Sequence, residues 1–157
     1  MRRKTKSSAR MAAGAAGLGV VAGLRSMTAP ALLAVAGYRG WARTARVLRQ
    51  ARAVKVASAL ALGEIVADKT PYIPNRTEPA SLTWRIASGA LVGGAFCASK
   101  HKPVAMGVLA GGFGALAGTY GAFYLRHRLA ERFPDRLIAL AEDAIAVGGG
   151  ALLVRSA

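Results

Sequence analysis

The stretch of sequence that decides the fold is residues 103–125, PVAMGVLAGGFGALAGTYGAFYL. It contains 23 residues and no charged side chain, and it is rich in glycine, alanine, leucine and aromatic residues. As an α-helix with a rise of about 1.5 Å per residue it would be about 34 Å long, enough to cross a hydrocarbon core of roughly 30 Å. This stretch therefore predicts a membrane-spanning helix.

Five further apolar segments occupy most of the remaining chain, at residues 11–24, 26–38, 54–67, 86–98 and 137–154. Each is shorter than the ~20 residues of a perpendicular crossing, so we expect some to be tilted, broken or re-entrant. A polar run ending in Pro30 interrupts the first two and predicts a helix break at Ala29. We therefore expect an all-α, polytopic membrane helix bundle of about five to six segments, with a broken or re-entrant first pair.

Charge is distributed as in membrane proteins. The 157 residues include 22 Lys and Arg but only 7 Asp and Glu, and the cations lie in blocks between the apolar segments. Such blocks are typical of the loops that flank membrane helices, so we expect membrane lipids and no nucleic acid as partners. If all six segments cross, or the first two re-enter, one side holds 14 cations and the other 8. The positive-inside rule then places both termini in the cytoplasm.

A single crossing by residues 11–38 is the alternative topology, and it divides the cations 12 to 9 with Arg25 left inside the membrane. In either case we expect residues 1–10 to form a basic cytoplasmic N-terminus and residues 11–154 a single membrane domain. A weak repeat relates residues 11–68 to 86–154, as in many transporters with two inverted halves.

The basic segment 39–55 has two interpretations. Arg43, Arg46 and Arg49 recur at helical spacing, which suits an amphipathic helix at the cytoplasmic membrane surface that binds anionic lipid. A solvated basic loop explains the same charges.

Four pairs of glycines are spaced four residues apart, which clears one helix face for the close approach of another backbone. They favour a tightly packed bundle and a homo-oligomer assembled through glycine-rich faces. The pairs are Gly19 and Gly23, Gly89 and Gly93, Gly107 and Gly111, and Gly114 and Gly118.

Acidic residues inside apolar segments are the main functional signal. Charges in the bilayer interior are costly, so they usually serve ion pathways, relays or ligand sites. The expected topology brings most of them to similar depth, where they would bind a small solute or ion. These candidates are Arg25, Glu64, Asp68, Lys69, Arg76, Glu142 and Asp143. The alternative is that these charges pair to lock the bundle or mark helix ends.

Other chemistry has little support in the sequence. No catalytic residue, metal site or cofactor is expected, because motifs of hydrolases, nucleotide-binding loops and paired cysteines are missing. Cys97 is the single cysteine, so no intrachain disulfide is expected. Trp84 and Arg85 are interpreted as an interfacial aromatic and a snorkelling cation at the start of a helix.

Several motifs resemble a known family of bacterial membrane proteins, domain-of-unknown-function family 4126. They are residues 23–30 (GLRSMTAP), 63–71 (GEIVADKTP), Arg85 with residues 88–90 (SGA), and 142–144 (EDA). The resemblance covers roughly residues 12–150. It implies a small helical protein of the bacterial inner (cytoplasmic) membrane and no established activity.

The function we expect is a transporter or channel-like protein with a polar, proton- or ion-linked cavity. Glu142 is the best candidate for a protonatable group, Asp143 and Glu64 are coupled to it, and Arg25 balances charge or meets an anionic solute. The alternative is a non-catalytic membrane scaffold or anionic-lipid-binding protein. An enzyme is not favoured, and a soluble helical protein is a further alternative because five of the six segments are short.

Overall fold

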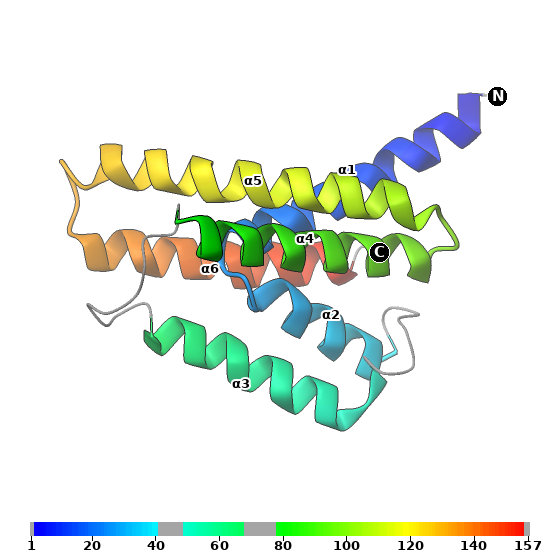
Figure 1. The fold of residues 1–157 in the computed structure, drawn as a ribbon, viewed down its shortest axis with the longest axis horizontal. Coiled ribbons are helices and arrows are strands. Elements are labelled where there is room, and N and C mark those ends of the chain that lie inside the picture. Colours follow the sequence, from blue (N-terminus) through cyan, green and yellow to red (C-terminus); the bar gives the residue numbers. More distant parts are fainter. Residues whose placement is uncertain (1, 41–48, 68–77, 156–157) are drawn as a thin grey trace.

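The computed structural model describes residues 2–40, 49–67 and 78–155, and within these ranges the chain is all-α, with six helices and no strand (Figure 1). The predicted all-α fold is confirmed. Each predicted apolar segment lies within one helix apart from a residue or two at its start. The helices are α1 (Arg2–Leu24), α2 (Thr28–Tyr38), α3 (Ala51–Ala67), α4 (Pro79–Ser99), α5 (Val104–Leu129) and α6 (Asp135–Arg155).

The closest packing in the molecule is that of α5 against α1 and α4. Glycine makes this approach possible, because a Cβ atom added at Gly111 would overlap the carbonyl oxygen of Gly89. A Cβ atom at Gly19 would overlap the carbonyl oxygen of Gly111 in the same way. All four predicted glycine pairs pack like this against helices of the same chain. These glycine faces are therefore occupied within one molecule.

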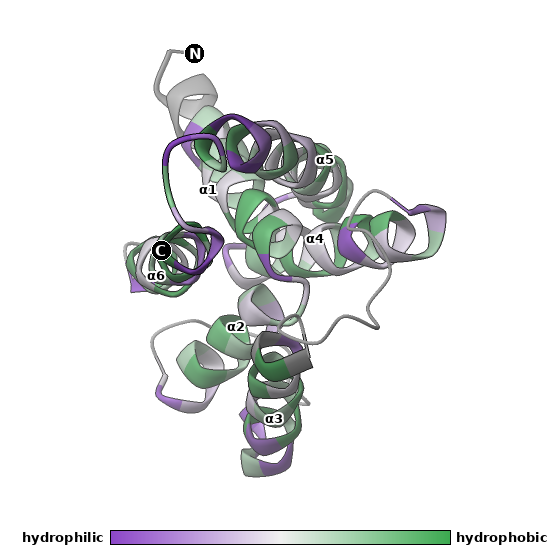
Figure 2. Cartoon of the chain, turned by 90° about the vertical axis from the view of Figure 1, so that its left-hand side faces the viewer, coloured by the Kyte–Doolittle hydropathy of each residue, from purple (hydrophilic) through white to green (hydrophobic). Residues whose placement is uncertain are grey.

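The other three helices surround this group. Helix α6 packs against α1, α2 and α5, whereas the backbone of α3 packs only against α2 among the described helices (Figure 2). The outward sides of α3, α5 and α6 carry large apolar side chains that no other part of the described chain covers. Examples are Val66, Phe113 and Leu152, which are 67%, 69% and 69% exposed.

Helices α1 and α2 turn back on each other at residues 25–27. The N-terminal end of α1, the C-terminal end of α2 and the turn from α4 to α5 lie toward one end of the molecule (Figure 1). The end of α3, the start of α4 and the turn from α5 to α6 lie toward the other. The first pair of apolar segments is thus broken, as predicted, and no continuous helix runs through residues 11–38. Whether this pair re-enters a membrane stays a prediction. The predicted basic N-terminus continues into α1.

Two helices in the described ranges, α5 and α6, are long and apolar enough to cross a membrane. The expectation that the last apolar segment is too short was wrong. Asp135, Arg136 and Arg155 extend that segment into a helix of 21 residues, which is about 32 Å long. Crossings by the other helices stay a prediction.

Candidate functional site

The break between α1 and α2 is the centre of the candidate site. The predicted break at Ala29 was displaced, because α2 already begins at Thr28 and Pro30 lies in its first turn. Proline is tolerated there, since the first N–H groups of a helix have no partner within the helix. The irregular residues are instead 25–27, and both helix ends beside them need partners from elsewhere in the fold.

Glu64 supplies those partners for α2. Its carboxylate comes from α3, near the end of that helix, and accepts hydrogen bonds from the backbone N–H groups of Ser26 and Met27 at 2.8 and 2.9 Å. The Ser26 hydroxyl donates a third hydrogen bond, also 2.8 Å long. A carboxylate in this position satisfies free donors and lies at the positive end of the helix dipole. Glu64 therefore caps a helix that lies far from it in sequence.

Arg25 connects the break to α6. Its Nε atom donates to Oδ1 of Asp143 at 2.7 Å, and its Nη2 atom lies 2.5 Å from the same oxygen. The Arg25 side chain is 3% exposed and that of Asp143 is 18% exposed. A guanidinium that is so fully removed from water is stable only beside anions or carbonyl acceptors.

Arg85 satisfies the carbonyl groups at the end of α1. Its Nη1 atom donates to the oxygens of Gly23 and Leu24 at 2.9 and 3.0 Å, and its Nη2 atom lies 3.8 Å from Oε1 of Glu64. The Ser88 hydroxyl, one turn further along α4, donates to the Ser26 carbonyl oxygen. Helix α4 thus holds the terminal carbonyls of α1 while α3 holds the first amides of α2.

Arg126 forms the outer part of the site. It binds Asp135 through two hydrogen bonds, from Nε at 2.8 Å and from Nη2 at 3.1 Å. Its Nη1 atom also lies 3.7 Å from Oε2 of Glu142. Glu142 is 8% exposed, whereas the Asp135 side chain is 69% exposed. Arg126 therefore joins a buried carboxylate to one at the surface.

Six of the charged residues described above form what we term the buried ionic cluster. The exposed Asp135 is not counted in it. Its three guanidinium groups and three carboxylates balance in formal charge. Beside it, the Thr28 hydroxyl is a buried polar atom without a hydrogen-bond partner among the described residues. No group of three or more His, Cys, Asp or Glu in the described ranges is placed to hold a metal ion. The cluster comprises Arg25, Glu64, Arg85, Arg126, Glu142 and Asp143.

The break lies inside the bundle. Asp143 is eight residues from the start of α6 and Arg85 six residues from the start of α4, which correspond to about 12 and 9 Å of helix. Thr119, whose hydroxyl lies 3.2 Å from the Gly23 carbonyl oxygen, is ten residues before the end of α5, or about 15 Å. These three helix ends lie at the same end of the molecule (Figure 1).

Four of the seven predicted ligand- or ion-binding candidates are brought together here: Arg25, Glu64, Glu142 and Asp143. Their role in binding stays a prediction. Asp68, Lys69 and Arg76 lie outside the described residues, as do the lipid-binding candidates Arg43 and Arg46. Arg49 is described and exposed.

Two members of the cluster were missed by sequence reasoning. Arg85 was interpreted as a snorkelling cation, which was wrong, since it is only 4% exposed and points into the bundle. Arg85 and Ser88 are three residues apart and therefore lie on one face of α4. This spacing was the sequence signal that could have indicated a buried polar face. Arg126 was counted among the basic loop residues because it directly follows the apolar stretch. The structure continues α5 through Arg126 to Leu129.

These features define a class: a small all-α protein with a charge-balanced ionic cluster at a broken helix. The chain belongs to the family described as Domain of unknown function (DUF4126), whose sequence model matches residues 12–155. The family resemblance is thereby confirmed. Searches of curated proteins and of solved structures found no match.

Proposed function

We propose that this chain is a small multi-pass membrane protein whose buried ionic cluster moves protons or small ions across the bilayer. The observation that carries the proposal is the Glu64 carboxylate, which bridges a peripheral helix and the broken helix inside the bundle. In transporters built from inverted repeats, ions and substrates usually bind where a helix is broken and ionisable side chains lie beside its ends.

The outer surface supports placement in a membrane. Helices α5 and α6 are the best spanning candidates, yet only 39% and 28% of their apolar windows are buried inside the chain. In a soluble protein such helices would form the core, and exposed apolar areas of this extent are rare. A bilayer would cover these faces.

Charge supports one orientation. If the first two segments return to the side of the N-terminus, the cations of the sequence divide 14 to 8, with both termini on the richer side. The positive-inside rule then makes that side cytoplasmic. We propose the bacterial inner membrane as the location, with the break opening toward the opposite side.

The contacts of Glu64 suggest how a proton would act. A proton bound to its carboxylate removes the negative charge that the α2 N-terminus and Arg85 share. Among the described helices, α3 packs its backbone only against α2 and otherwise meets α4 through the Glu64–Arg85 ion pair, so loss of this charge frees α3 to shift. The Thr28 hydroxyl would then take part in holding a water molecule or an ion at the opened break.

Flux through proteoliposomes tests the proposal. The full chain would be reconstituted in vesicles containing a pH-sensitive dye, with a potassium gradient and valinomycin to drive proton entry. We expect flux that Glu64→Gln and Glu142→Gln abolish, because each removes a titratable carboxylate and keeps its shape. Glu131→Gln, at an exposed turn position, is the control and should transport normally.

Equal flux in all three variants would contradict the proton relay. If no proton flux occurs, the same vesicles should be tested with Na⁺, K⁺, Cl⁻ and phosphate. Absence of flux for every ion would favour the second candidate, a membrane scaffold. That candidate is supported by the pairing within the cluster, since balanced charges also lock a bundle.

The scaffold candidate makes its own prediction. If the segment 39–55 binds anionic lipid, replacing Arg43, Arg46 and Arg49 by Gln should weaken binding to phosphatidylglycerol vesicles, most strongly at low salt. Unchanged binding would show that this segment does not recognise anionic lipid.

A further inference from the structure

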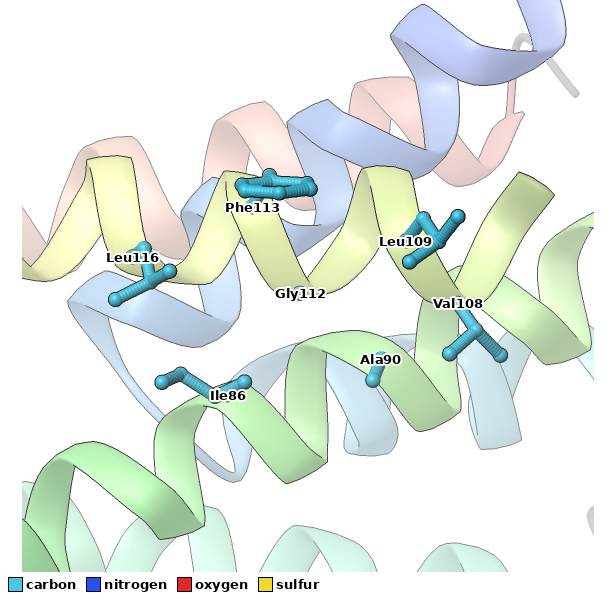
Figure 3. Close-up of a pocket in the computed structure, with 7 residues that line it drawn as sticks. All are labelled: Ile86, Ala90, Val108, Leu109, Gly112, Phe113 and Leu116. Carbon is cyan, nitrogen blue, oxygen red and sulfur yellow. The ribbon is translucent and has the colours of Figure 1, made fainter. Parts of the chain in front are cut away.

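An apolar groove runs along the outer surface between α4 and α5, and none of its lining residues belongs to the ionic cluster. Its volume is about 250 Å³ and its lining is wholly apolar. Figure 3 shows Ile86 and Leu116 at one end, Gly112 in the middle, and Ala90 and Val108 at the other end.

Small residues create the groove. A Cβ atom at Gly112 would lie 3.7 Å from Ile86 and 3.9 Å from Ala90, which are ordinary contacts with no overlap. By contrast, Gly111 touches the backbone of α4 directly. The two helices are therefore in backbone contact along one line and leave a furrow beside it. Leu109 and Phe113 flank this furrow and are 62% and 69% exposed.

The dimensions indicate the kind of occupant. Val108 and Leu116 are eight residues apart, which is about 12 Å of helix. A furrow of this length with a wholly apolar lining suits a single extended hydrocarbon chain.

Charge at one end of the groove indicates the headgroup. Lys100 and Lys102 lie in the turn before α5. Val108 is four residues into that helix, or about 6 Å of helical rise. No Asp or Glu occurs between Glu78 and Glu131. An anionic headgroup at this turn would therefore meet cations and no carboxylate of these helices.

We propose that this groove binds one acyl chain of an anionic phospholipid, whose phosphate pairs with Lys100 and Lys102. The proposal rests on the membrane location argued above and is independent of transport by the ionic cluster. An acyl chain that moves from bulk lipid into the groove leaves one apolar environment for another and gains only van der Waals packing. The lysines therefore provide most of the selectivity.

Quenching by brominated lipid tests the proposal on the full chain. A tryptophan reporter, Phe113→Trp, would be introduced beside the groove in a Trp41→Phe, Trp84→Phe background. The matched reporter is Phe123→Trp, an exposed position further along α5. Both proteins would be reconstituted in phosphatidylcholine vesicles with a rising fraction of dibrominated phosphatidylglycerol. We expect F113W to be quenched at a lower fraction than F123W, and in a saturable way.

Two sets of variants separate the groove from the headgroup contact. Gly112→Leu fills the groove and should remove the excess quenching. Gly121→Leu, at a position where an added Cβ atom meets nothing within 4 Å, should keep it. Lys100→Gln and Lys102→Gln should each lower the apparent affinity roughly fivefold. Arg128→Gln, at the other end of α5, should not.

Equal quenching of both reporters at every lipid composition would overturn the proposal, because bulk lipid alone would then explain the contact. Protection of F113W from all lipids would also overturn it and would indicate a second copy of the chain over the groove. If carbonate washing extracts the protein from vesicles, the membrane location itself fails. These outcomes are distinguishable from a loss of ion flux.

Discussion

The Nε atom of Arg25 donates a hydrogen bond of 2.7 Å to Oδ1 of Asp143, although 118 positions separate the two residues in the chain. This pair joins the break after α1 to the middle of α6. Glu64 joins the same break to α3, and Arg85 joins it to α4. One irregular turn thus connects helices from the first and the last thirds of the sequence.

The Arg25–Asp143 pair should be strongly coupled. Arg25→Ala leaves a carboxylate without its nearest guanidinium in a poorly hydrated place, which typically costs about 3–5 kcal/mol of unfolding free energy. The double variant Arg25→Ala, Asp143→Ala should lose less unfolding free energy than the two single variants lose in sum. Unfolding in mixed detergent micelles gives the three values.

The matched control for this pair is Asp135→Ala at the exposed partner of Arg126. Its effect should stay within about 1 kcal/mol, because an exposed ion pair is screened by solvent. Additive losses for Arg25 and Asp143 would contradict direct coupling.

Glu64 should control local opening of the break. Glu64→Ala removes the acceptor of two backbone N–H groups, so amide exchange of Ser26 and Met27 should accelerate roughly tenfold, as expected for loss of a helix cap. Peptides of α3 should also exchange faster, because this helix packs on α2 alone among the described helices.

Hydrogen–deuterium exchange with mass spectrometry checks the effect, with Glu131→Ala as the control. Unchanged protection at residues 26 and 27 would mean that Glu64 does not hold the break.

Replacing glycine by alanine should lower stability where the glycine packs against another helix and raise it where the glycine has free space. Gly111→Ala places a methyl group against the backbone of α4 and should destabilise the protein by about 1–3 kcal/mol or more. Gly148→Ala meets nothing within 4 Å and should stabilise α6 by up to about 1 kcal/mol. Thermal unfolding followed by circular dichroism compares them, and equal effects would contradict the packing.

Much of this fold was predictable from the sequence, because apolar segments with polar interruptions correspond directly to helices and turns. The glycine pairs also indicated close packing, since their spacing clears one face of a helix. Helix ends were less predictable. Asp135 and Arg155 continue α6 beyond its apolar segment, and hydropathy carries no signal for that extension.

The ionic cluster was predictable only in part. Glu64, Glu142 and Asp143 interrupt apolar runs, which marks them as unusual in any membrane segment. Arg85 stands at the edge of such a run, where interfacial and buried cations have the same sequence pattern. Only the three-dimensional position of the α1 carbonyl groups distinguishes them, and that depends on the packing of α4 against α1.

Transport and lipid binding both depend on one central claim, that the bundle lies in a membrane and that α1 and α2 return the chain to the side of the N-terminus. Single cysteines introduced in a Cys97→Ser background test it directly, with a membrane-impermeant thiol reagent applied to sealed, oriented vesicles. We predict that Arg10→Cys, Gln50→Cys and Lys102→Cys are labelled from one side and Glu131→Cys from the other. Labelling of Arg10→Cys and Gln50→Cys from opposite sides, or of all four positions from the same side, would contradict it.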